Sequence, residues 1–320
     1  MIALSFIIVL IAAKLRIKIS IFECFMENVH KYTVAGHQFA ISLPEGLSPY
    51  RTLAPYEPFA SGSDASPVFT LRLETLESFD ALTSGKVVSC MNDEAPYFWI
   101  FEDANGKYFF GFSYTKERPD CILMMPDSFM GSTVYILKES ADRFADFAIN
   151  NSSMLLYAFA TLEYDTMLVH ASVISWADGG YMFLGKSGTG KSTHSRLWLE
   201  HIPETSLLND DNPVIRMVDS KAYVYGSPWS GKTHCYKNEM YPLKAVVRLS
   251  QAPFNRIAAL APLQAFASLM PACSCKRWDS LAMTSLHKSV EKVISVVPCY
   301  HLQCLPDADA ASVCHSAVAR

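Results

Sequence analysis

Short apolar runs separated by polar turns fill the first part of the chain. Runs rich in β-branched and aromatic residues are typical of β-strands, and four of them cover residues 68–73, 97–102, 108–114 and 132–137. The pair Asn105-Gly106, between the second and third runs, indicates a hairpin turn. The pattern predicts a small β-rich module over residues 26–137.

The second part of the chain alternates helical and strand-like segments. Apolar spacing predicts helices at 140–162, 192–200, 263–270, 281–297 and 307–318. Strand-like runs lie between them, at 167–174, 181–184, 244–250 and 299–305. This alternation predicts a mixed α/β (α+β) domain over residues 138–320, so that the 320 residues form two domains.

Residues 1–25 form an apolar N-terminal extension that we expect to lie outside the fold. The apolar run 1–13 is too short to span a bilayer. Its basic residues follow the run, whereas a secretory signal carries them before it. A short membrane-surface anchor is the alternative interpretation.

Charge and cysteine content disfavour nucleic-acid binding and a zinc site. A formal net charge of −4 provides no basic surface for nucleic acid. The nine cysteines show no paired C-x-x-C spacing, and Cys273 and Cys275 form a single close pair, so a zinc site has little support. We expect reduced thiols in a cytoplasmic protein.

One octet matches the phosphate-binding loop pattern G-x-x-x-x-G-K-[ST] in full. Its residues are Gly185, Lys186, Ser187, Gly188, Thr189, Gly190, Lys191 and Ser192, and Thr193 follows them. An apolar run precedes the octet and a helical segment follows it, as a phosphate loop requires. Glycines allow backbone N–H groups to surround a phosphate, Lys191 adds charge, and Ser192 offers a hydroxyl ligand for Mg²⁺. The octet predicts a bound nucleoside triphosphate.

Two adjacent carboxylates, Asp210 and Asp211, follow a short apolar run one helix after the loop. A return strand after that helix would place them beside the loop, at the carboxyl edge of the sheet. There one carboxylate can bind Mg²⁺ and the other can accept a proton from an attacking hydroxyl. The alternative is a solvated turn capped by Pro213.

A histidine, His170, lies inside the strand-like run 167–174. A turn at Asp178-Gly179-Gly180 joins this run to the strand before the loop. The resulting hairpin would direct His170 toward the metal or the γ-phosphate. The alternative is a core histidine with a satisfied hydrogen bond.

These three features resemble the superfamily of HPr kinase/phosphorylase and phosphoenolpyruvate carboxykinase. The matching segments are Val-His-Ala-Ser around His170, the Gly-Lys-Ser-Gly-Thr-Gly-Lys-Ser loop, and the Asp210-Asp211 pair. ATP-type carboxykinases have His-Cys-Ser-Ala, Leu-Ser-Gly-Thr-Gly-Lys-Thr-Thr and Gly-Asp-Asp at these places. HPr kinases have His-Gly-Val, Ser-Gly-x-Gly-Lys-Ser and Ala-Asp-Asp. The likeness covers residues 165–232 and implies a P-loop kinase domain of this type.

The resemblance also implies a role for each matching residue. Lys191 contacts the β- and γ-phosphates of ATP, and Ser192 binds Mg²⁺ or Mn²⁺. Asp210 and Asp211 share the base and metal roles, with the base assigned to Asp210 and the metal to Asp211. His170 lies near the transferred phosphoryl group or a second metal. HPr kinases are oligomers, which implies a homo-oligomer.

Further basic residues are candidates for stabilising the transferred phosphoryl group. The segment Gly-Ser-Pro-Trp-Ser-Gly-Lys-Thr presents Lys232 as a phosphate clamp and Trp229 as a flat face for an acceptor or a base. It differs from typical HPr kinases, and an ordinary surface turn is the alternative. Arg248, in a strand-like run, and Arg256, in the following turn, are the other candidates.

The sequence therefore predicts an ATP-dependent phosphotransferase. Its acceptor is a hydroxyl, either a serine on a carrier protein or a small molecule. ATP-type carboxykinases are far longer and use additional lysine and arginine residues for oxaloacetate, so the length favours the kinase interpretation. Carboxykinase chemistry and a non-catalytic ATP-sensing module are the alternatives.

Overall fold

The computed structural model describes residues 29–80, 82, 85–91, 95–231 and 233–319, and the expected N-terminal extension lies outside them. The chain divides into two compact units. The first comprises 29–31, 40–52 and 70–149, and the second comprises 32–39, 53–69 and 150–319. Both contain mixed sheets, and the chain as a whole is a mixed α/β fold, in agreement with the coarse expectation.

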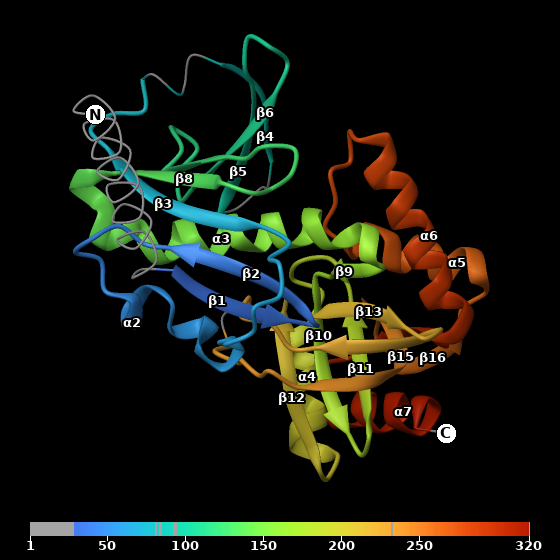
Figure 1. The fold of residues 1–320 in the computed structure, drawn as a ribbon. Helices are drawn as coiled ribbons and strands as arrows, with labels where there is room; N and C mark the ends of the chain where they lie inside the picture. The colour runs from blue at the N-terminus through green and yellow to red at the C-terminus, as the bar shows by residue number, and fades with distance from the viewer. Residues whose placement is uncertain (1–28, 81, 83–84, 92–94, 232, 320) are drawn as a thin grey trace, which may run out of the picture. The chain divides into compact units, whose positions relative to one another are not determined.

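An eight-stranded sheet, most of whose residues belong to the first unit, has the strand order β1-β2-β3-β8-β7-β6-β5-β4 (Figure 1). The strands are β1 (Val29–Val34), β2 (His37–Ser42), β3 (Thr70–Leu76), β4 (Lys86–Met91), β5 (Tyr97–Glu102), β6 (Tyr108–Ser113), β7 (Cys121–Met124) and β8 (Ser132–Leu137). Strand β3 pairs in parallel with β2 and with β8. From β8 onward, each strand pairs antiparallel with the next one in the order β8-β7-β6-β5-β4. The four strands expected from the apolar runs are confirmed.

The hairpin between β5 and β6 forms at the expected turn. Gly106 adopts a φ of 77°, in the left-handed region that glycine favours. The rings of Phe101 and Phe109 stack across the two strands with centroids 4.9 Å apart, and they pack with Phe79 and Ile122 in a small core. Two aromatic residues of this hairpin therefore belong to the core of the first unit.

The described helices follow the expected pattern, except for the short first one, α2, which was not predicted. They are α2 (Pro49–Thr52), α3 (Ala141–Thr161), α4 (Lys191–His201), α5 (Pro262–Leu269), α6 (Ser280–Val296) and α7 (Ala308–Val318). Short 3-10 segments are η1 (Ala54–Phe59), η2 (Lys138–Ser140), η3 (Leu162–Tyr164) and η4 (Met270–Ala272). No helix among the described residues combines the length and the apolar character needed to cross a bilayer.

The second unit contains a nine-stranded sheet in which one long strand, β15, belongs to two layers. Its strands are β9 (Thr166–Leu168), β10 (Ala171–Trp176), β11 (Gly179–Leu184), β12 (Thr205–Asp211), β13 (Val214–Val218), β14 (Lys221–Tyr225), β15 (Met240–Gln251), β16 (Arg256–Ala259) and β17 (Cys299–Cys304). The first residues of β15 pair with β14, which continues to β13 and β9. The rest of β15 pairs in parallel with β11 and β17.

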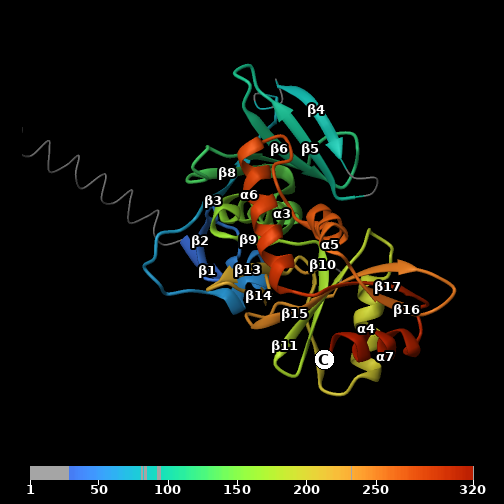
Figure 2. The ribbon, with the colours of Figure 1, turned by 90° about the vertical axis from the view of Figure 1, so that its right-hand side faces the viewer.

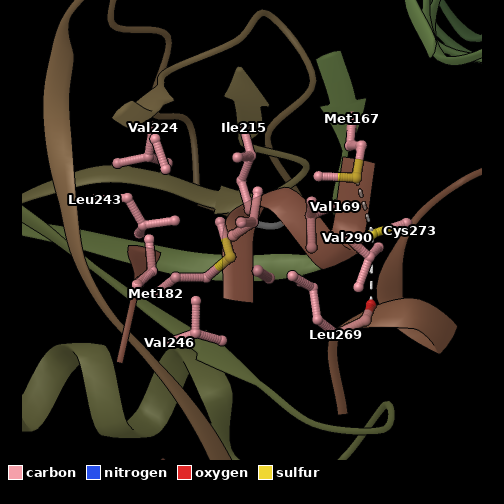
Figure 3. Packing of buried hydrophobic residues seen from close by; sticks show 14 of the residues in the cluster. Met167, Val169, Met182, Ile215, Val224, Leu243, Val246, Leu269, Cys273 and Val290 are labelled. Atoms are coloured by element: carbon pink, nitrogen blue, oxygen red, sulfur yellow. Dashed lines mark hydrogen bonds between the residues drawn. The ribbon is translucent and has the colours of Figure 1, made fainter. Parts of the chain in front are cut away.

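Helices cover both faces of the layer that contains β11 (Figures 1 and 2). Helices α4 and α7 pack against each other and bury Phe183 and Val247 on one face. Helices α5 and α6 contribute to the core on the other face, which includes Met182, Val246 and Leu243 (Figure 3). Alternate residues of β11 and β15 thus point into different cores, as strand geometry requires.

The strand expected over 167–174 is wrong as a single element. It is divided into β9 and β10, which pair with different neighbours: β9 with β13, and β10 with β11 and β12. Between them, Val169 N–H donates to the Pro213 carbonyl at 3.0 Å and His170 N–H donates to the Ala272 carbonyl at 2.8 Å. These bonds to distant segments interrupt the strand, and they leave His170 directly before β10 rather than inside a strand.

Candidate functional site

The strand order brings the predicted site residues to one edge of the sheet. Strand β10 pairs antiparallel with both β11 and β12 and lies between them. Strands β11 and β12 therefore run in the same direction, and their carboxyl ends meet the amino end of β10. His170 precedes β10, Gly185 follows β11, and Asp210 and Asp211 end β12. Strand β10 separates β12 from the strand that precedes the loop.

The loop between β11 and α4 has the backbone of an anion-binding turn. Gly188 and Gly190 adopt φ values of 76° and 106°, which side chains disfavour. Gly190 is the N-cap of α4 and has no side chain to cap the helix. The first N–H groups of the helix therefore stay available to a ligand. Residues 186–188 are exposed. A helix N-terminus that follows such a loop is favourable for phosphate.

Lys191, His170 and Asp211 form a continuous chain of polar contacts. The Lys191 ammonium Nζ lies 2.9 Å from His170 Nε2 and donates to the Gly185 carbonyl at 3.0 Å. His170 Nδ1 lies 3.1 Å from Asp211 Oδ1. Because a lysine ammonium only donates, His170 Nε2 accepts from it and Nδ1–H donates to Asp211. The lysine, the histidine and one carboxylate thus lie together at the start of α4.

Burial and charge act in opposite directions on Lys191. Burial lowers the pKa of Lys191, and the negative charges of Asp211 and Asp210 partly offset this effect. A partly desolvated ammonium interacts strongly with an anion, because little water screens it. The side chain is therefore suited to bind phosphate oxygens, as the loop pattern indicates.

Asp210 and Asp211 have different surroundings although they are adjacent. Asp210 is 7% exposed, and its Oδ2 accepts a hydrogen bond from the Thr233 hydroxyl at 2.9 Å. Asp211 is more open, and its Oδ2 accepts from the Asn212 amide at 2.8 Å. Adjacent strand residues face opposite sides of a sheet, which explains the difference. The two carboxylates can therefore perform different tasks.

The segment between β14 and β15 packs directly on this carboxylate pair. Gly231 N–H donates to the Asp210 carbonyl at 3.0 Å, and Ser230 forms a β-bridge with Asp211. A Cβ at Gly231 would lie 3.1 Å from both the Asp210 carbonyl oxygen and Asp211 Cβ. Glycine at this position permits the close approach. Thr233 and Gly231 are site residues that the sequence interpretation missed.

A hydrogen-bond network fixes the carboxyl end of β12. The Asn209 amide donates to Ser227 Oγ at 3.2 Å, and the Ser227 hydroxyl donates to the Asn212 carbonyl at 2.6 Å. Asn212 N–H donates to Asn209 Oδ1 at 3.0 Å. The asparagines on either side of the Asp-Asp pair were the signal for this network.

The residues present are compatible with Mg²⁺ bound together with a triphosphate. Among the described residues, no group of three or more His, Cys, Asp or Glu side chains could hold a metal. Mg²⁺ rarely needs such a cage, because it commonly uses one or two protein ligands with waters and phosphate oxygens. Ser192 is exposed on the first turn of α4, and both aspartates lie close enough to Lys191 to affect its pKa.

The remaining predicted residues have different outcomes. Lys232 lies outside the described residues. The interpretation of Trp229 as an exposed flat face is wrong, because the side chain is 1% exposed and its indole N–H donates to Ser153 Oγ at 3.1 Å. Arg248 is exposed on β15, in register with Leu184, the last residue before the loop. Thr193 is half-buried on α4.

Arg248 therefore flanks the phosphate loop on the side away from Asp210 and Asp211. Strand β15 is one neighbour of β11, whereas β10 and β12 lie on the other side. Arg256, on β16, is farther along the same side and is also exposed. The proposed role of Arg248 and Arg256 in stabilising a transferred phosphoryl group stays a prediction.

Comparisons with known proteins add little to this description. No protein-family model matches the chain, and no curated protein matches it. Among solved structures, the chain is similar to the Hpr(Ser) kinase/phosphatase from Coxiella burnetii, at 11% sequence identity and a TM-score of 0.27. That match covers 48% of this chain and 93% of the other. At this TM-score the likeness carries no functional argument, so a function must be inferred from the site itself.

Proposed function

We propose that this chain is an ATP-dependent phosphotransferase of the HPr kinase type that transfers the γ-phosphate to a hydroxyl group. One observation carries the proposal. A complete phosphate-loop sequence lies between a buried strand and a helix, and its lysine is in contact with His170, which is paired with Asp211. A glycine-rich turn without a ligand has no need for a desolvated lysine beside two carboxylates.

Binding of the triphosphate depends on the loop and on Lys191. The loop amides and the first N–H groups of α4, which no side chain caps, would hold the β-phosphate. Lys191 uses two of its three N–H donors in its contacts with Gly185 and His170. A further donor stays available for a phosphate oxygen. The charge of the ammonium then offsets the negative charge of the β- and γ-phosphates.

Mg²⁺ would be held by Ser192 and Asp211, and it would neutralise charge on the phosphate oxygens. The Asp211 carboxylate also orients His170 through the Nδ1 contact. His170 in turn holds the Lys191 ammonium through Nε2. The three side chains thus support one another where they would contact the terminal phosphate.

Asp210 is the proposed general base. Its Oδ2 is occupied by the Thr233 hydroxyl, which leaves Oδ1 to accept a proton from the acceptor hydroxyl. As the acceptor oxygen bonds to the γ-phosphorus, the bond from this phosphorus to the β-γ bridging oxygen breaks and ADP leaves. The acceptor is a serine of a carrier protein or a small molecule.

The test is transfer of label from γ-labelled ATP by the full chain in the presence of Mg²⁺. Fractionated metabolites and carrier proteins serve as acceptors, and Lys191→Ala serves as the blank. We expect a labelled product with the wild type and none with the variant. A separate assay for phosphoenolpyruvate formed from oxaloacetate distinguishes carboxykinase chemistry. Tight ATP binding without transfer to any acceptor, together with full function of Asp210→Asn, would favour a nucleotide sensor instead.

A further inference from the structure

Two loops lie beside the phosphate loop, on the side away from the carboxylates. They follow β15 and β17, and they comprise residues 252–255 and 305–307. Strands β11, β15 and β17 are parallel neighbours, with Leu184 paired to Arg248 and Gln251 paired to Cys304. Their carboxyl ends therefore share one edge of the sheet. The Gln251 amide donates to the Gly188 carbonyl at 3.4 Å, which joins this region to the phosphate loop.

Asn255 fixes the two loops to each other. Its amide Nδ2 donates to Asp307 Oδ1 and to Asp309 Oδ2, each at 2.9 Å. Its Oδ1 accepts the Leu305 N–H at 2.8 Å, and Ala252 N–H donates to the Cys304 carbonyl at 3.1 Å. The chain thus crosses over the end of β17 in a defined conformation. These hydrogen bonds hold the backbone of the two loops together within the protein itself.

These fixed loops expose apolar surface beside the site. Phe254 is 47% exposed and Leu305 is 38% exposed. A single exposed apolar side chain is common on protein surfaces and needs no function. Here an aromatic ring and a leucine occur on two loops that Asn255 connects, at the edge that carries the phosphate loop. An apolar surface with a flat ring is suited to a planar heterocycle.

The direction of the triphosphate relates these loops to a specific part of the ligand. The carboxylates lie on the β10 and β12 side of β11, and the γ-phosphate must face them for transfer to occur. The nucleoside then extends toward β15 and β17. Neighbouring strands are about 4.8 Å apart, so β17 lies about 10 Å from β11. This span is within the reach of a nucleoside attached to a triphosphate in the loop.

We propose that Phe254 and Leu305 form the nucleobase subsite, in which the purine base of the bound nucleotide stacks on the Phe254 ring. The inference rests on the proposed function, because it takes the orientation of the triphosphate from the carboxylates. It adds the part of the ligand that the phosphate loop does not recognise. Arg248, between the loop and this subsite, is then placed for the α-phosphate or the ribose rather than for the γ-phosphate.

The test compares two ligands that share a triphosphate but not a base. Calorimetric titration of the full chain with ATP and with inorganic tripolyphosphate, both with Mg²⁺, measures the contribution of the nucleoside. We expect Phe254→Ala to weaken ATP binding by about fivefold to a hundredfold, the range for loss of a base-stacking ring, and Leu305→Ala to weaken it less. Tripolyphosphate binding should be unchanged in both variants. The matched controls are Tyr50→Ala and Leu281→Ala, which remove side chains that are 83% and 79% exposed elsewhere.

Each outcome decides between the proposals. Wild-type affinity of Phe254→Ala for ATP would overturn the subsite, and so would an equal loss for ATP and tripolyphosphate. In either case, if the wild type binds tripolyphosphate and Lys191→Ala does not, the proposed phosphate site would still stand. If the wild type binds neither ligand, the proposed function itself fails, and the subsite with it.

Discussion

The buried histidine on α4, His194, gives a quantitative prediction about stability. The side chain is 2% exposed, and burial lowers its pKa from 6.5 to about 4. Its Nε2 accepts a hydrogen bond from the Trp198 indole at 3.1 Å, and its Nδ1 has no partner. The histidine follows the phosphate loop by one turn, so its protonation would disturb the helix that presents the loop.

The sign of the effect follows from the two pKa values. Between pH 6.5 and about 4, the unfolded chain binds a proton at His194 and the folded chain does not. The folded state is therefore most favoured above pH 6.5, and this stability is lost as the pH falls. One pKa unit corresponds to about 1.4 kcal/mol, so His194 should contribute a loss of roughly 2–3 kcal/mol between pH 7.5 and pH 4.5.

The assay is urea unfolding of the wild type and of His194→Gln at both pH values. Glutamine can still accept from the Trp198 indole, but it does not titrate. His37, whose pKa is also lowered by burial to about 4, contributes equally to both proteins and cancels in the difference. We expect the wild type to lose roughly 2–3 kcal/mol more than the variant. Parallel losses in the two proteins would refute the reasoning that burial keeps His194 neutral.

Three further predictions concern the carboxylate pair and its surroundings. Thr233→Val removes the hydroxyl that orients Asp210 and should lower kcat by about tenfold or more with little change in the KM for ATP, while Thr233→Ser restores the rate. Loss of rate in both variants would show that the hydroxyl is not the cause. Gly231→Ala should slow transfer, because the added Cβ would crowd Asp210 and Asp211. The control Gly62→Ala, whose added Cβ would meet nothing within 4 Å, should not slow it. Equal steady-state rates of the two variants would contradict the packing argument. Trp229→Ala should lower the free energy of unfolding by about 3–5 kcal/mol, as measured in urea, and a loss below 1 kcal/mol would contradict its burial.

Local sequence patterns were sufficient for much of the site. The phosphate loop, the strand before it and the helix after it are continuous in sequence, so their residue types determine the turn directly. The hairpin of β10 and β11 was also predictable, but its turn lies at Ala177 and Asp178 rather than at Asp178-Gly179-Gly180, because Gly179 and Gly180 pair with β10 as part of β11. Strand order then brings His170 and the aspartates to the same edge.

Features that depend on distant partners were not predictable. The break at Val169 and His170 results from bonds to Pro213 and Ala272, which no local pattern reveals. Trp229 is buried because it packs with Phe39 and Tyr157, at ring-centroid distances of 6.2 and 4.9 Å. The contact of Thr233 with Asp210 likewise joins residues on separate segments. In each case a tertiary contact overrides what the neighbouring residues suggest.

The central claim is that the loop binds ATP while the adjacent carboxylates carry out the transfer. The most direct measurement compares wild type and Asp210→Asn in single-turnover transfer of labelled γ-phosphate, at ATP concentrations that saturate both. We predict equal affinity for ATP and a loss of transfer in the variant. Transfer by Asp210→Asn at the wild-type rate would contradict the claim.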